Sequence, residues 1–289
     1  MIVNLIKNIE GYIISRSEAV VKKKNWILIV SLLLPFSVYF FSFPSFERLP
    51  TEFASLWENN MRQVEHPLTP YEYHPESHES KMAFRLFIPI VAHILNFGMP
   101  GILILQGIFG IFLFYYTTLL IKKITNDDVI AFLVTLSLSF TLAGRASFTE
   151  VRGLYDGVAL FFLVFAMYHK NPFAIFSGVF LCAWVDERGL IASILVFLYW
   201  LVILTEKKEK IIICLSIVVA WIFYLILRLF LNRQFGLSTA SGAIGIKIFV
   251  HQLNNLPLAV WAALEGNWLL VSAAIYILFR QGRYFSGMF

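Results

Sequence analysis

Residues 173–204 read FAIFSGVFLCAWV, DER and GLIASILVFLYWLVIL in succession, and this stretch decides the fold. Its two apolar runs are joined by three consecutive ionisable residues, Asp186, Glu187 and Arg188. Charges at or inside a membrane boundary are energetically expensive, so by default they mark a functional site. The stretch therefore predicts two membrane helices with a polar site at the turn between them.

The composition indicates a polytopic membrane protein. Hydrophobic residues make up 59% of the 289 residues and charged residues only 14%, which leaves too little polar surface for a soluble domain. We therefore predict one all-α transmembrane domain over 1–289, a helical bundle of about eight spans. The predicted spans are the apolar runs at 26–43, 101–121, 129–146, 157–169, 172–185, 189–205, 211–231 and 258–279.

Segments of three kinds are expected within this domain. Apolar residues recur at helical spacing in 1–25, which predicts an interfacial helix on the membrane surface; a disordered tail is the alternative. Residues 44–100 form an extracytoplasmic loop. The apolar run 84–97 within it contains Pro89 and is too short to span comfortably, so we interpret it as a re-entrant or interfacial helix. Residues 101–289 form the bundle.

Lysines set the predicted orientation. They flank the spans in alternation, at 22–24, at 122 and 123, at 170 and at 207, 208 and 210. Placing all of them in the cytoplasm satisfies the positive-inside rule without conflict. The N-terminus is then cytoplasmic, and the charged turn at 186–188 lies on the outer face. The net charge of +5 follows from this topology, so nucleic-acid binding is not expected.

A second charged segment, EVRGLYD at 150–156, is predicted to share the outer face. A carboxylate can act as general base on an acceptor hydroxyl, and the planar fork of arginine suits phosphate oxygens. The alternatives are helix capping, arginine snorkelling and a merely solvated loop. The candidate catalytic residues are Glu47, Asp156 and Glu187, and the candidate substrate- and phosphate-binding residues are Arg85, Arg145, Arg152, Asp186, Arg188 and Arg228.

Metal, nucleotide and disulfide chemistry have little support in the sequence. His74 and His78 are four residues apart, and one helical turn would bring them together as metal ligands. Prolines at 67, 70 and 75 disfavour a helix there. No Walker A, GxGxxG, GxSxG, HExxH or CxxC pattern is present. Cys182 and Cys214 lie within apolar runs, so no disulfide is predicted.

A family resemblance covers about residues 44–205. The segments RGLYDGVALFFLVFAMYHKNP and AWVDERGLIAS, with Phe84-Arg85-Leu86 upstream, are similar to bacterial membrane proteins implicated in cell-surface glycopolymer formation. A first span, an acidic outer loop, a surface helix and short helical hairpins follow in an order that resembles GT-C-type glycosyltransferases. Gly157 and Gly189 depart from the pattern, since alanine is commoner at both positions.

This resemblance implies transfer of a sugar from a polyprenyl-phosphate-linked donor to a glycan or lipid acceptor, on the outer face of the bacterial inner membrane. Glu47 or Asp156 would activate the acceptor hydroxyl. Arg85, Arg152 and Arg188 would hold the lipid phosphate and stabilise its charge as it leaves. Some GT-C enzymes use a divalent metal and others do not. The alternatives are a transporter or flippase of lipid-linked glycan intermediates, and a non-catalytic subunit of a glycan-assembly complex.

Overall fold

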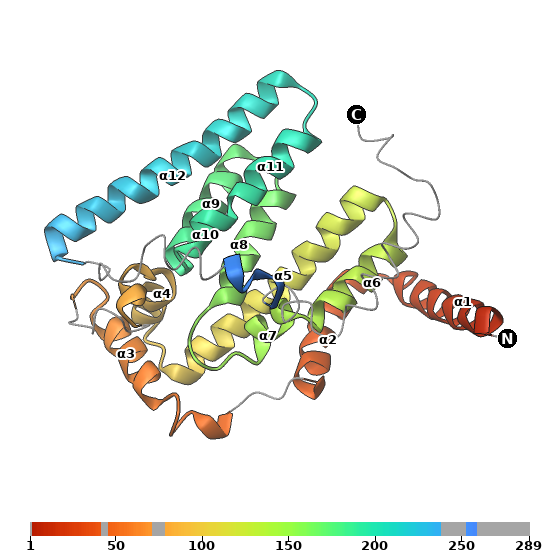
Figure 1. Cartoon of the computed structure of the whole chain (residues 1–289), viewed down its shortest axis with the longest axis horizontal. Coiled ribbons are helices and arrows are strands. Elements are labelled where there is room, and N and C mark those ends of the chain that lie inside the picture. Colours follow the sequence, from red (N-terminus) through yellow and green to blue (C-terminus); the bar gives the residue numbers. More distant parts are fainter. Residues whose placement is uncertain (1, 42–45, 71–78, 238–252, 259–289) are drawn as a thin grey trace.

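The computed structural model describes residues 2–41, 46–70, 79–237 and 253–258. Throughout these residues the chain is helical, without strands (Figure 1). The first part comprises α1 (Ile2–Val21), α2 (Trp26–Phe41), η1 (Phe46–Arg48), α3 (Ala54–Glu65), η2 (Glu79–Phe84), α4 (Phe87–Leu95) and α5 (Met99–Thr125). The second comprises α6 (Asp128–Ser139), α7 (Leu142–Phe148), α8 (Asp156–Tyr168), α9 (Pro172–Val185), α10 (Arg188–Ala192), α11 (Ile194–Ile203) and α12 (Lys207–Phe235).

The apolar helices differ in whether they are long enough to cross a membrane. By length and composition α5 and α12 can each cross one, and α6 with α7 forms a third candidate if the bent pair is one span. The apolar helices α2, α8, α9 and α10–α11 are shorter. The all-helical fold is therefore confirmed for the described residues, which include two or three helices able to span a membrane, while the number of about eight spans stays a prediction. The predicted span 258–279 and the pair His74 and His78 lie outside the described residues, apart from Leu258.

The predicted span at 129–146 is not one straight helix. α6 and α7 meet at 68° instead, because the chain leaves the helix at Phe140 and Thr141. The hydroxyl of Thr141 accepts a hydrogen bond from the backbone N–H of Ala143 at 3.3 Å and caps α7. The predicted span 189–205 is also interrupted, at Ser193 between α10 and α11.

Two further segments are helical where the sequence predicted helices. α1 covers most of 1–25, so this segment is a helix and not the disordered tail that was the alternative. α4 lies within the predicted short run 84–97, and Pro89 falls in its first turn, where the backbone N–H needs no partner in the helix. Asn96, with a φ of 53°, ends α4 in the left-handed conformation. How α1 and α4 sit relative to a membrane stays a prediction.

The α8–α9 hairpin positions the charged turns. α8 packs against α5 and α9, and α9 also packs against α12. Both hairpin helices bury most of their apolar side chains, as expected for helices that are apolar all round. They run in opposite directions and have nearly equal lengths, 13 and 14 residues. The start of α8 at Asp156 and the end of α9 before Asp186 therefore lie at the same end of the hairpin (Figure 1).

Candidate functional site

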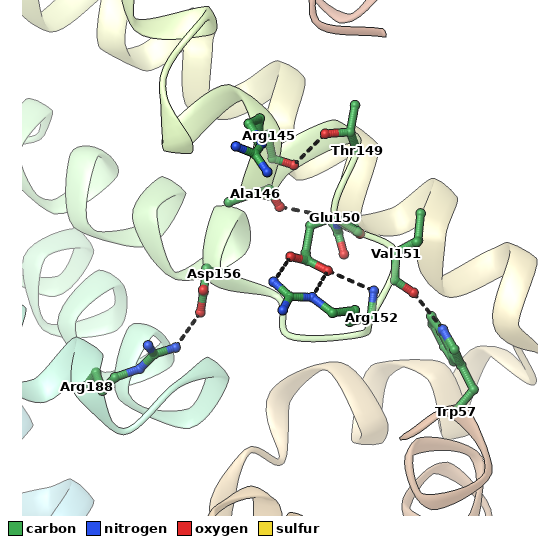
Figure 2. Close-up of polar contacts among 10 residues, drawn as sticks. Trp57, Arg145, Ala146, Thr149, Glu150, Val151, Arg152, Asp156 and Arg188 are labelled. Carbon is green, nitrogen blue, oxygen red and sulfur yellow. Dashed lines mark hydrogen bonds and ion pairs between the residues drawn. The ribbon is translucent and has the colours of Figure 1, made fainter. Parts of the chain in front are cut away.

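An ion pair joins the two charged segments. Arg188 Nη2, at the start of α10, donates to Asp156 Oδ1, at the start of α8, over 2.7 Å (Figure 2). The sequence predicted that both segments belong to one polar site if they share a face. Their direct contact shows that they do form one site, although the membrane side on which it lies stays a prediction.

Asp186 extends this pair into a chain of four alternating charges. Its Oδ1 accepts from the backbone N–H of Arg188 at 2.8 Å and from Arg188 Nε at 3.0 Å, and its Oδ2 accepts from Arg188 Nη2 at 2.6 Å. Arg85 Nη2 lies 3.1 Å from the same Oδ2. Arg85, Asp186, Arg188 and Asp156 thus form a network, called the charge ladder here, that ties together η2–α4, α9, α10 and α8.

The charge ladder has a buried end and an open end. The side chains of Arg85 and Asp186 are each 3% exposed, whereas Arg188 is 63% and Asp156 35% exposed. Arg85 Nε and Nη1 are buried with no hydrogen-bond partner among the described residues. Asp186 both holds Arg85 and bonds within the turn into α10. The N-cap of α10 is Glu187, whose side chain makes no capping bond, so the bond from Asp186 Oδ1 to the backbone N–H of Arg188 is a local turn contact at the start of α10.

The two carboxyl groups of the ladder have opposite pKa shifts. Burial raises the pKa of Asp156 above its usual value, and the nearby charge of Asp186 adds to this rise, while Arg188 opposes it. Burial alone would also raise the pKa of Asp186, but the hydrogen bonds from Arg188 and the charge of Arg85 hold it below its usual value. Of the two, Asp156 therefore holds its proton to higher pH.

An apolar pocket of about 210 Å³ opens beside the exposed end of the ladder. Asp156, Asp186 and Arg188 line one part of it, and the rest is lined by small and aliphatic side chains of α7, α8 and α10. These are Leu142, Ala146, Ala159, Leu160, Leu163, Gly189 and Ala192. A pocket with charged groups at one part and an apolar remainder suits an amphiphilic ligand.

Glu187 and Arg228 form a second ion pair next to the ladder. Arg228 Nη1 lies 3.4 Å from Glu187 Oε2 and donates to the hydroxyl of Tyr224 at 3.1 Å. The Arg228 guanidinium also stacks over Phe84, 4.2 Å from the ring centroid. This pair fixes α12 to the α9–α10 turn and to η2, so both residues contribute to the framework of the site.

The remaining candidates lie away from the ladder. Arg152 contacts Glu150 through Nε at 2.8 Å and through Nη2 (Figure 2). Arg145 is exposed on α7, next to Ala146 of the pocket. Glu47 is exposed in η1, and within the described chain no hydrogen bond or ion pair links it to the ladder. Of the candidate carboxylates and arginines, Asp156 and Arg188 therefore belong to the ladder, whereas Glu47 and Arg152 do not.

Sequence reasoning missed the residues that support the 149–156 loop. Gln106 is buried in α5 and its Nε2 donates to the carbonyls of Ala146 at 3.2 Å and Glu150 at 2.9 Å. Trp57 Nε1 donates to the carbonyl of Val151 at 2.7 Å (Figure 2). Gln106 could have been noticed in the sequence as an amide side chain within the long apolar run of α5. Nothing local in the sequence identifies Trp57.

Gly157 and Gly189 lie where helices approach closely. A Cβ at Gly189 would lie 2.4 Å from Cys182 Sγ and 2.9 Å from the Cys182 carbonyl oxygen. A Cβ at Gly157 would lie 2.7 Å from Ser147 Cα. Alanine at either position would therefore force neighbouring backbone to move. The close approach of neighbouring atoms thus gives both glycines a steric reason.

Among the described residues, no three His, Cys, Asp or Glu side chains lie together as a metal-binding group. Asp156 and Asp186 of the ladder both bind Arg188. The chain matches no protein-family model, no curated protein and no solved structure. The case for a function therefore rests on the site itself.

Proposed function

We propose that this chain is a GT-C-like membrane glycosyltransferase of about eight spans. It transfers a sugar from a polyprenyl-phosphate-linked donor to a glycan or lipid acceptor on the outer face of the bacterial inner membrane. The observation that carries the proposal is the charge ladder at the edge of an apolar pocket. A polyprenyl phosphate has the same two parts, a charged head group and an apolar chain.

Arg188 can bind an added anion without breaking the ladder. A guanidinium carries five N–H donors. The Nε donor and the two Nη2 donors of Arg188 are directed to Asp186 and Asp156. The two N–H groups of Nη1 have no hydrogen-bond partner within the described chain, and the side chain is 63% exposed. We infer that Nη1 binds the donor phosphate, while Asp186 holds the guanidinium in place.

Asp156 is then placed to act on the acceptor. It shares Arg188 with the phosphate, and burial raises its pKa, which makes its carboxylate a stronger base than an ordinary aspartate. In the proposed step, the acceptor hydroxyl attacks the anomeric carbon and gives its proton to the Asp156 carboxylate. The bond between the anomeric carbon and the phosphate oxygen breaks, and its electron pair leaves with the phosphate. Arg188 stabilises the negative charge that develops there.

The test uses the full chain, purified and reconstituted in lipid nanodiscs. A panel of polyprenyl-phosphate-linked sugars is supplied with candidate acceptors, and release of free polyprenyl phosphate is measured by mass spectrometry. Asp156→Asn is expected to bind donor without turning it over. Arg188→Ala is expected to lose binding of polyprenyl phosphate. Glu58→Gln, which removes an exposed carboxylate paired with Arg62 on α3, serves as the matched control. Unchanged turnover in both ladder variants would overturn the proposal.

A non-catalytic subunit is the second candidate, and one observation favours it. Arg85, Asp186, Arg188 and Asp156 already neutralise one another, as the charges of a purely structural network would. On this alternative, Arg188→Ala would lower the stability of the fold, while the wild-type chain would bind polyprenyl phosphate no better than polyprenol. Comparing these two lipids by native mass spectrometry separates the candidates.

A further inference from the structure

A second cavity, of about 670 Å³, lies between the start of α2 and the second half of α5. Most of its lining is apolar and aromatic, and includes Trp26, Leu28, Phe112 and Tyr115. Trp26 packs edge-to-face against Phe132 of α6 at 6.4 Å, which fixes this wall of the cavity. The volume falls in the range of ordinary small-molecule sites, roughly 300–1,000 Å³.

The polar edge of this cavity is basic. Asn25 and Lys122 line it, and Asn25 directly follows Lys22-Lys23-Lys24 in the turn between α1 and α2. Lys22 lies 3.8 Å from Glu18, and Lys122 lies 2.7 Å from Asp128. Lys23 and Lys24 are exposed, and the described residues offer them no ion-pair partner.

We propose that this cavity binds an anionic phospholipid. The lipid's apolar part lies against Trp26, Leu28 and Phe112, and Lys23 and Lys24 attract its phosphate. Tryptophan and tyrosine side chains are enriched at the level of lipid head groups, and lysines beside a membrane helix attract anionic lipids. The inference does not depend on glycosyl transfer, because it uses none of the residues of the charge ladder.

The positive charges beside this cavity are lysines, and this determines which lipids the site can distinguish. Lysine presents a compact, strongly hydrated charge, without the planar fork that arginine offers to phosphate. The site is therefore expected to distinguish anionic from zwitterionic lipids but not one anionic head group from another. Phosphatidylglycerol and phosphatidylserine should bind alike, and both should bind more tightly than phosphatidylcholine.

The test places a reporter in the cavity. Leu28, which is 48% exposed and lines the cavity, is changed to cysteine in the full chain, in a Cys214→Ser background. The rate of maleimide labelling is measured in neutral detergent with added phosphatidylglycerol, phosphatidylserine or phosphatidylcholine. Both anionic lipids should slow labelling at lower concentration than phosphatidylcholine. Lys23→Ala/Lys24→Ala should reduce this preference by up to about 25-fold, since each surface lysine contributes roughly fivefold in affinity.

A matched pair of lysines provides the control. Lys207 and Lys208 are exposed at the start of α12, so Lys207→Ala/Lys208→Ala removes the same charge without touching the cavity. This variant should keep the full preference for anionic lipids. Three results would each overturn the proposal: equal protection by all the lipids, equal loss of preference in both lysine variants, or a cysteine at 28 that stays unlabelled without lipid. The last result would mean that the chain itself fills the cavity.

Discussion

Arg85 and Asp186 lie 3.1 Å apart, and only 3% of either side chain is exposed. An ion pair this deeply buried carries a desolvation penalty in both partners, which only good geometry and further hydrogen bonds offset. Asp186 has those further bonds, from Arg188, whereas Arg85 Nε and Nη1 have none within the described chain. Asp186 therefore neutralises the buried charge of Arg85 and orients the exposed side chain of Arg188.

We expect Asp186→Asn to destabilise the fold far more than Asp156→Asn. The first change leaves the buried Arg85 charge without its carboxylate, and breaking such a pair costs about 3–5 kcal/mol. The second removes a carboxyl group that is 35% exposed and paired with an exposed arginine, so a loss of under about 1 kcal/mol is expected. Denaturant unfolding in detergent measures both. Equal losses would show that the Arg85–Asp186 pair is not the stabilising one.

The buried pair can also be tested in a double-mutant cycle. Arg85→Met leaves a buried apolar side chain in place of the unpaired guanidinium, so the double variant Arg85→Met/Asp186→Asn should be more stable than Asp186→Asn alone. A double variant whose loss is the sum of the two single losses would argue against direct coupling.

Under the proposed function, activity should fall at low pH, with a midpoint above the usual range of an aspartic acid. Burial and Asp186 raise the pKa of Asp156, and Arg188 opposes the rise. Only the ionised carboxylate can accept the acceptor's proton. Arg188→Gln removes the opposing charge, so the acid limb of kcat at saturating donor should move to higher pH. Arg152→Gln breaks a pair with Glu150 and removes a charge that acts on Asp156 more weakly than Arg188 does, so it should move the acid limb in the same direction but less.

The same pKa shift has a consequence for stability. A carboxyl group whose pKa is raised in the folded state binds its proton more tightly there than in the unfolded chain. The contribution of Asp156 is therefore present at low pH and is lost as the pH rises through its folded-state pKa. Asp186 has a lowered pKa, so its contribution is present above the unfolded-state pKa and is lost as the pH falls.

The sequence predicted the α8–α9 hairpin, and the contact between the charged residues at its open end, from the pattern of neighbouring segments alone. Two apolar runs of similar length on either side of 169–171 form an antiparallel pair, and their outer ends must coincide. The pairing of Arg85 with Asp186 depended instead on how η2 and α4 dock on α9, which no periodic pattern encodes. The break at Phe140 was missed because hydrophobic residues alternate with small polar ones across it, and no proline in 129–146 marks the end of a helix.

Gly189→Ala is expected to destabilise the α9–α10 turn by about 1–3 kcal/mol. The new Cβ would lie 2.9 Å from the Cys182 carbonyl oxygen, so α9 and α10 would have to separate. Gly107→Ala is the control, because no atom lies within 4 Å of a Cβ there, and alanine should stabilise the middle of α5 by about 0.5–1 kcal/mol. The two substitutions are expected to shift the midpoint of thermal unfolding in opposite directions. A neutral Gly189→Ala would mean that the turn adapts freely.

Gln106→Leu should impair the site without touching a charged residue. Gln106 Nε2 bonds the carbonyls of Ala146 and Glu150 and so attaches the loop before Asp156 to α5. Leucine keeps the volume but leaves both buried carbonyls without this donor, at a loss of about 1–3 kcal/mol. Turnover of lipid-linked sugar should fall with it, because the start of α8 is no longer held. Ser216→Ala, which removes an exposed hydroxyl bonded within its own helix, should change stability by less than about 0.5 kcal/mol. If Gln106→Leu lowers stability but leaves turnover at the wild-type value, the loop supports the fold and does not position Asp156.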